Sequence, residues 1–191
     1  MKEILLCKYG EIVLKGANRK YFEDTLCREL KRKARRHGEF DMYRAQSTIY
    51  IEPKNENIDF EGMFESACKV FGITSVCRCA IAEKSLDDIA RVVREYIPQF
   101  LTGKKSFKVE CKRSDKSFPL NSIELAREMG GVVLSTLPRL KVDVHNPDET
   151  VVIEIREFGA YIHAGRFKGA GGMPVGTNGK AMLLLSGGID S

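Results

Sequence analysis

The sequence predicts an α+β fold built from two small consecutive units, and three observations lead to this prediction. Segments with strand and helix character alternate in the order β-α-β-β-α-β over residues 1–82. A new series of helical and strand patterns runs from 85 to 164. Residues 165–180 are rich in Gly, Pro, Thr and Asn, which is typical of a linker, and an apolar run follows at 181–185.

The first unit has the element order of a ferredoxin-like domain, in which two helices cover one face of an antiparallel sheet. Its strands are predicted at 3–9, 40–45, 48–52 and 74–82, and its helices at 18–37 and 60–71. Asn18 is the expected N-cap of the first helix, and Gly38 suits its C-terminal end. The buried face of that helix is marked by apolar residues every fourth position: Phe22, Leu26, Leu30 and Ala34.

The second unit begins with a helix that Ser85 and Asp88 start as a capping box and that Pro98 ends or kinks. Its other elements are predicted as a strand at 107–112, a helix that starts at Asn121 and stops before Pro138, and strands at 141–144, 151–158 and 161–164. A turn at 159–160 joins the last two strands. Gly130-Gly131 inside the second helix lowers helix propensity, so we expect close packing against a neighbour there.

The charge and cysteine content narrow the class of protein. The net charge is +5, and residues 1–37 hold eleven Lys and Arg against five Asp and Glu. A second basic patch lies in residues 104–116. Such patches favour a polyanion partner, although a solvated helix face is the alternative interpretation. The apolar runs are far shorter than the ~20 residues of a membrane helix.

The six cysteines follow no zinc-ligand spacing. No secretory signal is evident, so free thiols in a reducing cytosol are expected. Packing in the core is the better interpretation for most of them: Cys7, Cys27, Cys68, Cys77, Cys79 and Cys111.

The apolar run at 181–185 is predicted to be a buried parallel strand, and a short loop follows it: Ser186, Gly187, Gly188, Ile189, Asp190 and Ser191. Glycines let backbone amides approach a phosphate closely, and serine hydroxyls add hydrogen bonds. Asp190 could hold a Mg²⁺ ion that bridges phosphates. The loop lacks the lysine and the spacing of a Walker A loop.

These residues match the pyrophosphate-binding motif of PP-loop ATPases, and the sequence upstream narrows the resemblance. Residues 8–19, 107–119 and 171–177 are similar to motifs of the tRNA 4-thiouridine synthetases, the ThiI-type tRNA sulfurtransferases. The matching motifs extend over essentially the whole chain and occur in the family's order. The resemblance implies an N-terminal ferredoxin-like domain at 1–75, a THUMP domain at 76–167, a linker at 168–180 and the start of a PP-loop domain at 181–191.

The resemblance also implies an activity. Enzymes of this family adenylate a uridine of tRNA with ATP and Mg²⁺, then replace the activated oxygen with sulfur from a cysteine persulfide that a cysteine desulfurase charges. Some members supply sulfur for the thiazole of thiamine. The protein is then expected in the cytoplasm, with its catalytic residues beyond 191 and none within this chain, which alone should be inactive. The identity of the tRNA and the formation of a homodimer are left open.

By this resemblance the THUMP domain holds the tRNA near its 3′ end. Phe118 is a candidate base-stacking surface or, equally, a core residue. The candidate tRNA-binding cations are Lys112, Arg113 and Lys116 near the 3′ end, Arg166 and Lys168 beside the linker, and Arg32, Lys33, Arg35 and Arg36 toward the RNA body.

Two other functions are weighed against this one. The chain could be the RNA-binding part of another THUMP-containing enzyme, such as an RNA methyltransferase, but the loop at 186–191 argues against a methyltransferase. It could also be a free-standing interaction module. The apolar run at 181–185 argues against that, because it would leave a hydrophobic strand edge exposed.

Overall fold

Strand β1 (Glu3–Tyr9) lies at the centre of the first unit, and the element order there is the predicted one. The computed structural model describes residues 2–183 and 186–188. The remaining elements of this unit are η1 (Glu11–Asn18), α1 (Arg19–Ala34), β2 (Phe40–Ala45), β3 (Thr48–Pro53), α2 (Phe60–Cys68) and β4 (Ile73–Ala82). The strands pair antiparallel in the order β2-β3-β1-β4.

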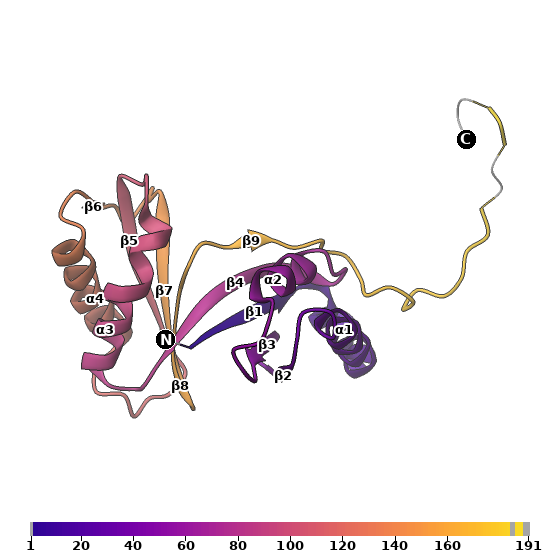
Figure 1. Cartoon of the computed structure of the whole chain (residues 1–191), viewed down its shortest axis with the longest axis horizontal. Helices are drawn as coiled ribbons and strands as arrows, with labels where there is room; N and C mark the ends of the chain where they lie inside the picture. Colours follow the sequence, from indigo (N-terminus) through magenta and orange to yellow (C-terminus); the bar gives the residue numbers. More distant parts are fainter. Residues whose placement is uncertain (1, 184–185, 189–191) are drawn as a thin grey trace.

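Alternate residues of β1 point to the two faces of this sheet, which places the core. Leu5 and Cys7 pack with Leu26 and Leu30 of α1, and this face is the one the helices cover (Figure 1). Val76 joins this core, whereas Cys77 and Cys79 lie in a cluster on the opposite face, as predicted. All six cysteines are free, and Cys7, Cys77 and Cys79 are buried.

The helix ends differ from the sequence prediction. A 3₁₀ helix, η1, precedes α1, so Asn18 already has helical backbone angles, φ −84° and ψ −5°. A side chain in that conformation cannot take the N-cap geometry, and Asn18 makes no capping hydrogen bond. Helix α1 ends at Ala34 and α2 at Cys68, three residues earlier than predicted in each case. Gly38 has a positive φ, +125°, but lies beyond the C′ position of α1.

The second unit places two helices on one face of four strands, and the helices begin at the predicted capping residues. Its elements are α3 (Leu86–Tyr96), η2 (Ile97–Leu101), β5 (Ser106–Arg113), α4 (Ser122–Thr136), β6 (Lys141–Val142), β7 (Glu149–Arg156), β8 (Gly159–Ala164) and β9 (Phe167–Lys168). Ser85 accepts a hydrogen bond from the Asp88 amide, but the Asp88 carboxylate accepts from the Glu83 amide, so the predicted capping box there is only half formed. Asn121 with Glu124 forms a complete capping box. No helix in the described residues is long and apolar enough to cross a membrane.

The two units share one sheet, which the sequence patterns did not predict. The far edge of β4 pairs with β8 at Ala80–Ala82, and the strand order becomes β2-β3-β1-β4-β8-β7-β5-β6. Strand β9 lies within the predicted linker and pairs with β4 at Ser75 and Val76. The predicted domain boundary after residue 75 therefore falls inside β4, and the division into domains stays a prediction. The turn between β7 and β8 is Glu157–Phe158, not 159–160.

The predicted strand at 181–185 is not formed in its described part. Residues 181–183 have no strand structure, and Met182 and Leu183 are 94% and 81% exposed. A parallel strand needs a partner for its backbone groups, and within the described residues this segment extends away from the sheet (Figure 1). Leu184 and Leu185 lie outside the described residues, as do Ile189, Asp190 and Ser191 of the predicted phosphate-binding loop.

Candidate nucleic-acid interface

The sheet face that the helices leave uncovered, here called the open face, carries Lys112 of the first group of predicted cations, and Arg113 and Lys116 of that group lie at its edge and in the loop that follows. Phe107, Val109 and Cys111 pack beneath the helices, so the alternate residues Lys108 and Lys112 of β5 lie on the open face.

The Glu110 carboxylate lies among several of these cations. It binds Lys108 Nζ at 2.6 Å. Lys108, Lys112 and Arg166 together lower the pKa of Glu110, with the hydrogen bond from Lys108 as the largest cause. The structure therefore brings Lys112 and Arg166 together, although they are 54 residues apart in the sequence. Lys168 is exposed on β9, opposite Ser75 of β4.

The loop that follows β5 is held by an arginine that the sequence suggested as an RNA contact. Arg113 Nη1 donates to the carbonyl oxygens of Phe118 and Leu120, each at 2.9 Å. Asp115 ties the other end of the loop by accepting from Lys84 Nζ at 2.7 Å and from the Ser117 hydroxyl at 2.6 Å. These contacts hold the pKa of Asp115 well below its usual value. Lys112 and Lys116 extend from this fixed frame into solvent.

Phe118 itself points into the protein. Its side chain is 5% exposed and belongs to the core beneath α3 and α4. A ring in that position cannot stack on a base without leaving the core, so the packing alternative is the one that the structure favours.

The four predicted cations at the end of α1 lie at the other side of the molecule (Figure 1). Arg32 donates two hydrogen bonds to Glu29, at 2.9 and 2.6 Å, which offset its charge. Within the described residues no ion pair is formed by Lys33, Arg35 or Arg36. This group is therefore separate from the cations of the open face.

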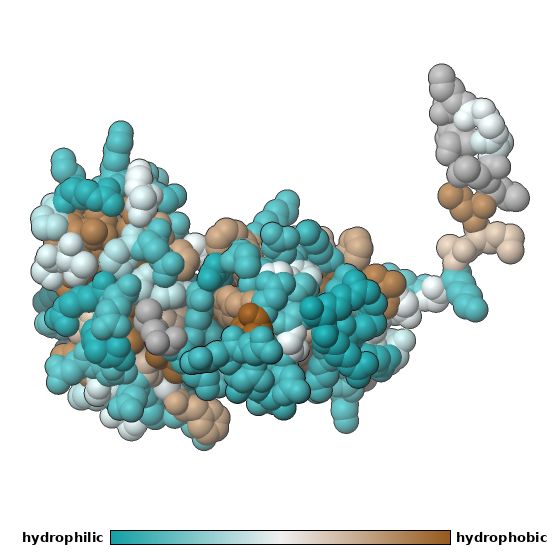
Figure 2. Space-filling view, viewed as in Figure 1, coloured by the Kyte–Doolittle hydropathy of each residue, from teal (hydrophilic) through white to brown (hydrophobic). Residues whose placement is uncertain are grey.

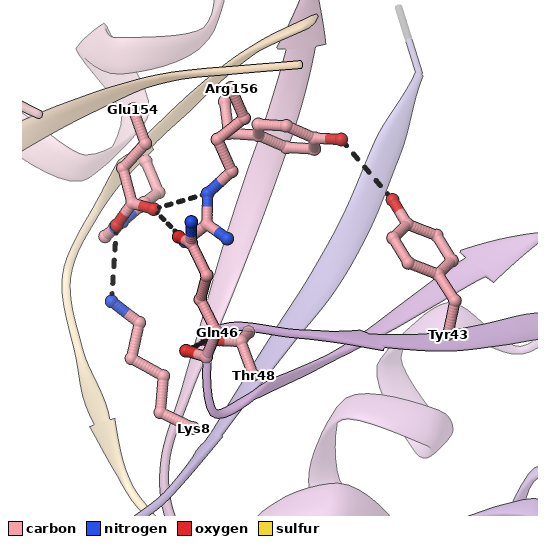
Figure 3. A network of polar contacts seen from close by, with 8 residues as sticks. Lys8, Tyr43, Gln46, Thr48, Glu154 and Arg156 are labelled. Atoms are coloured by element: carbon pink, nitrogen blue, oxygen red, sulfur yellow. Dashed lines mark hydrogen bonds and ion pairs between the residues drawn. The ribbon is translucent and has the colours of Figure 1, made fainter. Parts of the chain in front are cut away.

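A buried charge cluster that the sequence patterns did not predict lies where the two units meet. Glu154 of β7 is 3% exposed, and Lys8 Nζ of β1 binds its Oε1 at 3.4 Å (Figure 3). Arg156 Nε donates to the other carboxylate oxygen at 3.0 Å, and Nη2 donates to it as well. His163 Nε2 lies 3.9 Å from Glu154. Lys8 and Glu154 come from different units, so this cluster links them.

The pKa values in this cluster follow from the balance between burial and charge pairing. Burial alone would raise the pKa of Glu154, but His163, Arg156 and Lys8 outweigh it and lower the pKa. Burial opposes protonation of His163, but Cys77 and Glu154 beside it raise its pKa. A carboxylate with paired cations is therefore the stable form of the cluster near neutral pH.

A cleft of about 520 Å³ opens beside this cluster, between the β2–β3 hairpin and the β7–β8 turn. The rings of Tyr43 and Tyr50 are stacked in it, with centroids 4.6 Å apart, and the Arg156 guanidinium lies 5.2 Å from the Tyr50 ring. Nη1 of Arg156 and the hydroxyl of Tyr50 are buried without a hydrogen-bond partner in the described chain. The cleft thus places aromatic rings beside a guanidinium, a combination that suits stacking with a planar ligand.

Phe158 at the rim of this cleft is a functional candidate that the sequence patterns missed. It lies in the β7–β8 turn, and 83% of its surface is exposed. The strand predicted at 151–158 included Phe158, whereas β7 ends at Arg156. An aromatic side chain in a tight turn has no core to pack into, and this exposure would have marked Phe158 as a candidate. An exposed ring next to cations is a surface on which an unpaired base can stack.

Two family models match consecutive parts of the chain. The first, described as the ThiI ferredoxin-like domain, matches residues 4–77, and the second, the THUMP domain, matches residues 83–163. The probable tRNA sulfurtransferase of Acetivibrio thermocellus is 45% identical over 195 residues, which cover all of this chain and 49% of that protein. The chain thus spans about half the length of the curated relatives it matches.

Solved structures agree with this relationship. A crystal structure of a 4-thiouridine synthetase–RNA complex with bound ATP superimposes with a TM-score of 0.84 and 32% identity, covering all of this chain and 48% of that one. The crystal structure of PH1313 from Pyrococcus horikoshii gives a TM-score of 0.78 and 27% identity, covering 92% of this chain and 58% of that one.

The buried cluster gives a stability prediction. Glu154→Gln should lower the free energy of unfolding by about 3–5 kcal/mol at neutral pH, because Lys8 and Arg156 lose their buried counter-charge. Glu65→Gln, in an exposed pair with Lys69, should change it by no more than ~1 kcal/mol. Urea denaturation of both variants measures this. Equal effects of the two changes would contradict the importance of the cluster.

The same variant has a defined pH dependence. The folded pKa of Glu154 is below its ordinary value of 4.5, so its contribution is present above that pH and is lost as the pH falls through the folded pKa. In the wild type the raised pKa of His163 keeps it protonated in both states below about pH 5, so it adds no slope there. The stability gap between the wild type and Glu154→Gln should therefore begin to narrow below about pH 5 and continue to narrow as the pH falls further.

Proposed function

The chain belongs to the ThiI family through its consecutive ferredoxin-like and THUMP domains, and from this we propose that it is the tRNA-binding part of an ATP-dependent tRNA sulfurtransferase that makes 4-thiouridine. The observation that supports it best is the continuity of the open face. Lys112 is paired in register with Glu154, and Glu154 holds Arg156, which lines the aromatic cleft. Cations for phosphates and rings for bases therefore lie along one surface, as RNA binding requires.

We assign different tasks to the candidate residues. Lys112, Lys116 and Arg166 contact RNA phosphates, because their side chains are exposed on or beside the open face. Arg113 shapes the loop that carries Lys116. Phe158 offers the stacking surface first suggested for Phe118.

The remaining candidate cations lie away from this group. Lys168 extends it along β9. At the end of α1, Lys33, Arg35 and Arg36 attract the RNA body, and Arg32 contributes less because Glu29 offsets its charge.

The residues at 186–191 form the proposed ATP-binding loop, with Asp190 as the Mg²⁺ ligand. The described part fits this role: nothing lies within 4 Å of the position a Cβ of Gly187 would take, so a phosphate can approach its backbone amide. Bound ATP supplies an adenylate that turns the uridine oxygen into a leaving group. A cytoplasmic cysteine desulfurase is the proposed sulfur donor.

The activity is tested with the full-length protein that contains this chain. Deletion of its gene should abolish 4-thiouridine in cellular tRNA, and mass spectrometry of digested nucleosides measures this. Re-expression of the whole protein should restore the nucleoside, whereas residues 1–191 alone should not. Loss of a methylated nucleoside with unchanged 4-thiouridine would instead support the alternative, an RNA methyltransferase.

Reversal of the exposed loop cations should weaken RNA binding. Lys112→Glu with Lys116→Glu should reduce the affinity of this chain for tRNA about tenfold or more and flatten the dependence on salt by ~0.9 per lost phosphate contact. Filter binding at several salt concentrations measures both effects. Lys20→Glu with Lys69→Glu makes the same charge change at exposed sites of the first unit. Equal losses in the two double variants would show that only net charge matters.

The two phenylalanines should respond in opposite ways. Phe158→Ala should weaken binding of an RNA stem with an unpaired 3′ extension by about 1–3 kcal/mol and leave the free energy of unfolding nearly unchanged. Phe118→Ala should instead lower the free energy of unfolding by about 3–5 kcal/mol. Binding to a blunt-ended stem is the control, and it should be unaffected by Phe158→Ala. Unchanged affinity for the extended RNA would remove Phe158 from the site.

A further inference from the structure

Strand β5 forms an edge of the sheet over most of its length. Strand β6 pairs only with Ser106 and Phe107, and it ends after Val142. On its other side β5 pairs with β7 from Phe107 to Arg113. No strand of the described residues therefore lies beside 108–113 on the outer side, and α4 runs alongside (Figure 1).

The backbone groups at this edge can be assigned. The amides of Lys141 and Asp143 donate to the carbonyl oxygens of Lys105 and Phe107, so these odd-numbered residues point toward the β6 side. Because a strand alternates every two residues, the N–H and C=O groups of Val109 and Cys111 point to the same side, beyond the end of β6. They form a row of donors and acceptors that is ready to pair with one more strand.

A hollow lies between this edge and α4, and two glycines keep it open. The hollow holds about 610 Å³, and its apolar lining includes Leu134, Val142 and Val144. Gly130 and Gly131 each lower helix stability by about 1 kcal/mol relative to alanine. A Cβ at Gly131 would meet nothing within 4 Å, and one at Gly130 would touch only Val109 at 4.0 Å. The close packing expected at Gly130 and Gly131 is absent from the described residues. The two glycines therefore leave space on this side of α4 that a ligand or partner segment could fill.

Positive charge surrounds one end of the hollow. A second depression shares Val142 and Val144 with it and is lined by Lys104, Lys105, Arg139 and Lys141, with Asp143 as its carboxylate. Figure 2 shows apolar surface framed by hydrophilic surface on the part of the molecule that carries β6 and α4. The side chains of the β5 edge that face away from α4 add Lys108 and Lys112, with the Glu110 carboxylate between them paired to Lys108. A partner here should therefore be acidic.

We propose that this groove binds an extended acidic segment of a partner protein as an added strand on β5. Backbone hydrogen bonds to Val109 and Cys111 would hold the segment. Its apolar side chains would enter the hollow over Gly130 and Gly131, and its alternate carboxylates would face the lysines. Single-stranded RNA fits less well in the hollow itself, because Phe107, the one aromatic side chain among the described residues that line it, is fully buried and offers no stacking face. The exposed imidazole of His145 lines only the second depression.

The experiment uses a fluorescent peptide of alternating valine and glutamate, about eight residues long. Fluorescence anisotropy should show binding to this chain, and weaker binding of the matching valine–lysine peptide. The same acidic peptide with N-methyl groups along one edge should bind about tenfold less tightly, because it cannot donate to β5. Gly131→Leu should also reduce the affinity about tenfold, because the leucine fills the hollow while improving helix propensity.

Ser135→Leu is the matched control, since it adds an exposed leucine to α4 outside the groove and should bind the peptide like the wild type. Absence of binding to the wild type overturns the proposal, as does equal binding by Gly131→Leu. Equal binding of the N-methylated peptide overturns strand addition. If Gly131→Leu weakens binding of a single-stranded RNA and leaves peptide binding unchanged, the groove is an RNA subsite and the proposal is wrong.

Discussion

The pairing of β4 on both edges is the constraint on which the rest of the structure depends. One edge pairs with β1 from Ile73 to Ala80, and the other is divided between β9 at Ser75–Val76 and β8 at Ala80–Ala82. Between these two short ladders, residues 77–79 have no strand partner on that edge within the described chain. The sheet of the second unit therefore departs from β4 only at its C-terminal end. The two units meet at an angle fixed by backbone hydrogen bonds, because a rigid ladder joins them without a linker.

This junction explains why charge is buried there. Lys8 lies on β1 and Glu154 on β7, and the pairing through β4 and β8 brings them within 3.4 Å in a region that solvent barely reaches. An ion pair in such a place contributes little net stability compared with apolar packing, but removal of one partner is costly. The cluster therefore favours one relative placement of the units. That placement aligns the cations of β5 with the aromatic cleft, so the geometry of the proposed RNA surface depends on the buried pairing of Lys8 with Glu154, the register partner of Lys112.

Local patterns predicted the elements well and the tertiary pairing poorly, for physical reasons. The four-residue apolar spacing of α1 and the capping box of Asn121 with Glu124 depend on neighbours in sequence, and both are confirmed. Asn18 does not cap α1, because it is the last residue of η1 and has helical backbone angles. Strand β9 was missed because Phe167–Lys168 forms only on the exposed edge of β4. The buried Glu154 gave no signal, since its partners Lys8 and His163 are assembled by topology and not by spacing.

The motif around residues 107–119 divides into residues that shape the loop and residues that the loop presents. A guanidinium has five N–H donors in a fixed plane, and Arg113 uses it to bind two carbonyl oxygens of its own loop. A lysine ammonium is a hydrated point charge on a flexible stem, which suits Lys112 and Lys116 to phosphates at variable positions. Burial of Phe118 anchors the same loop from below. Sequence resemblance cannot separate these roles. A residue that shapes a loop and a residue that the loop presents to a ligand are equally necessary, so both belong to the same motif.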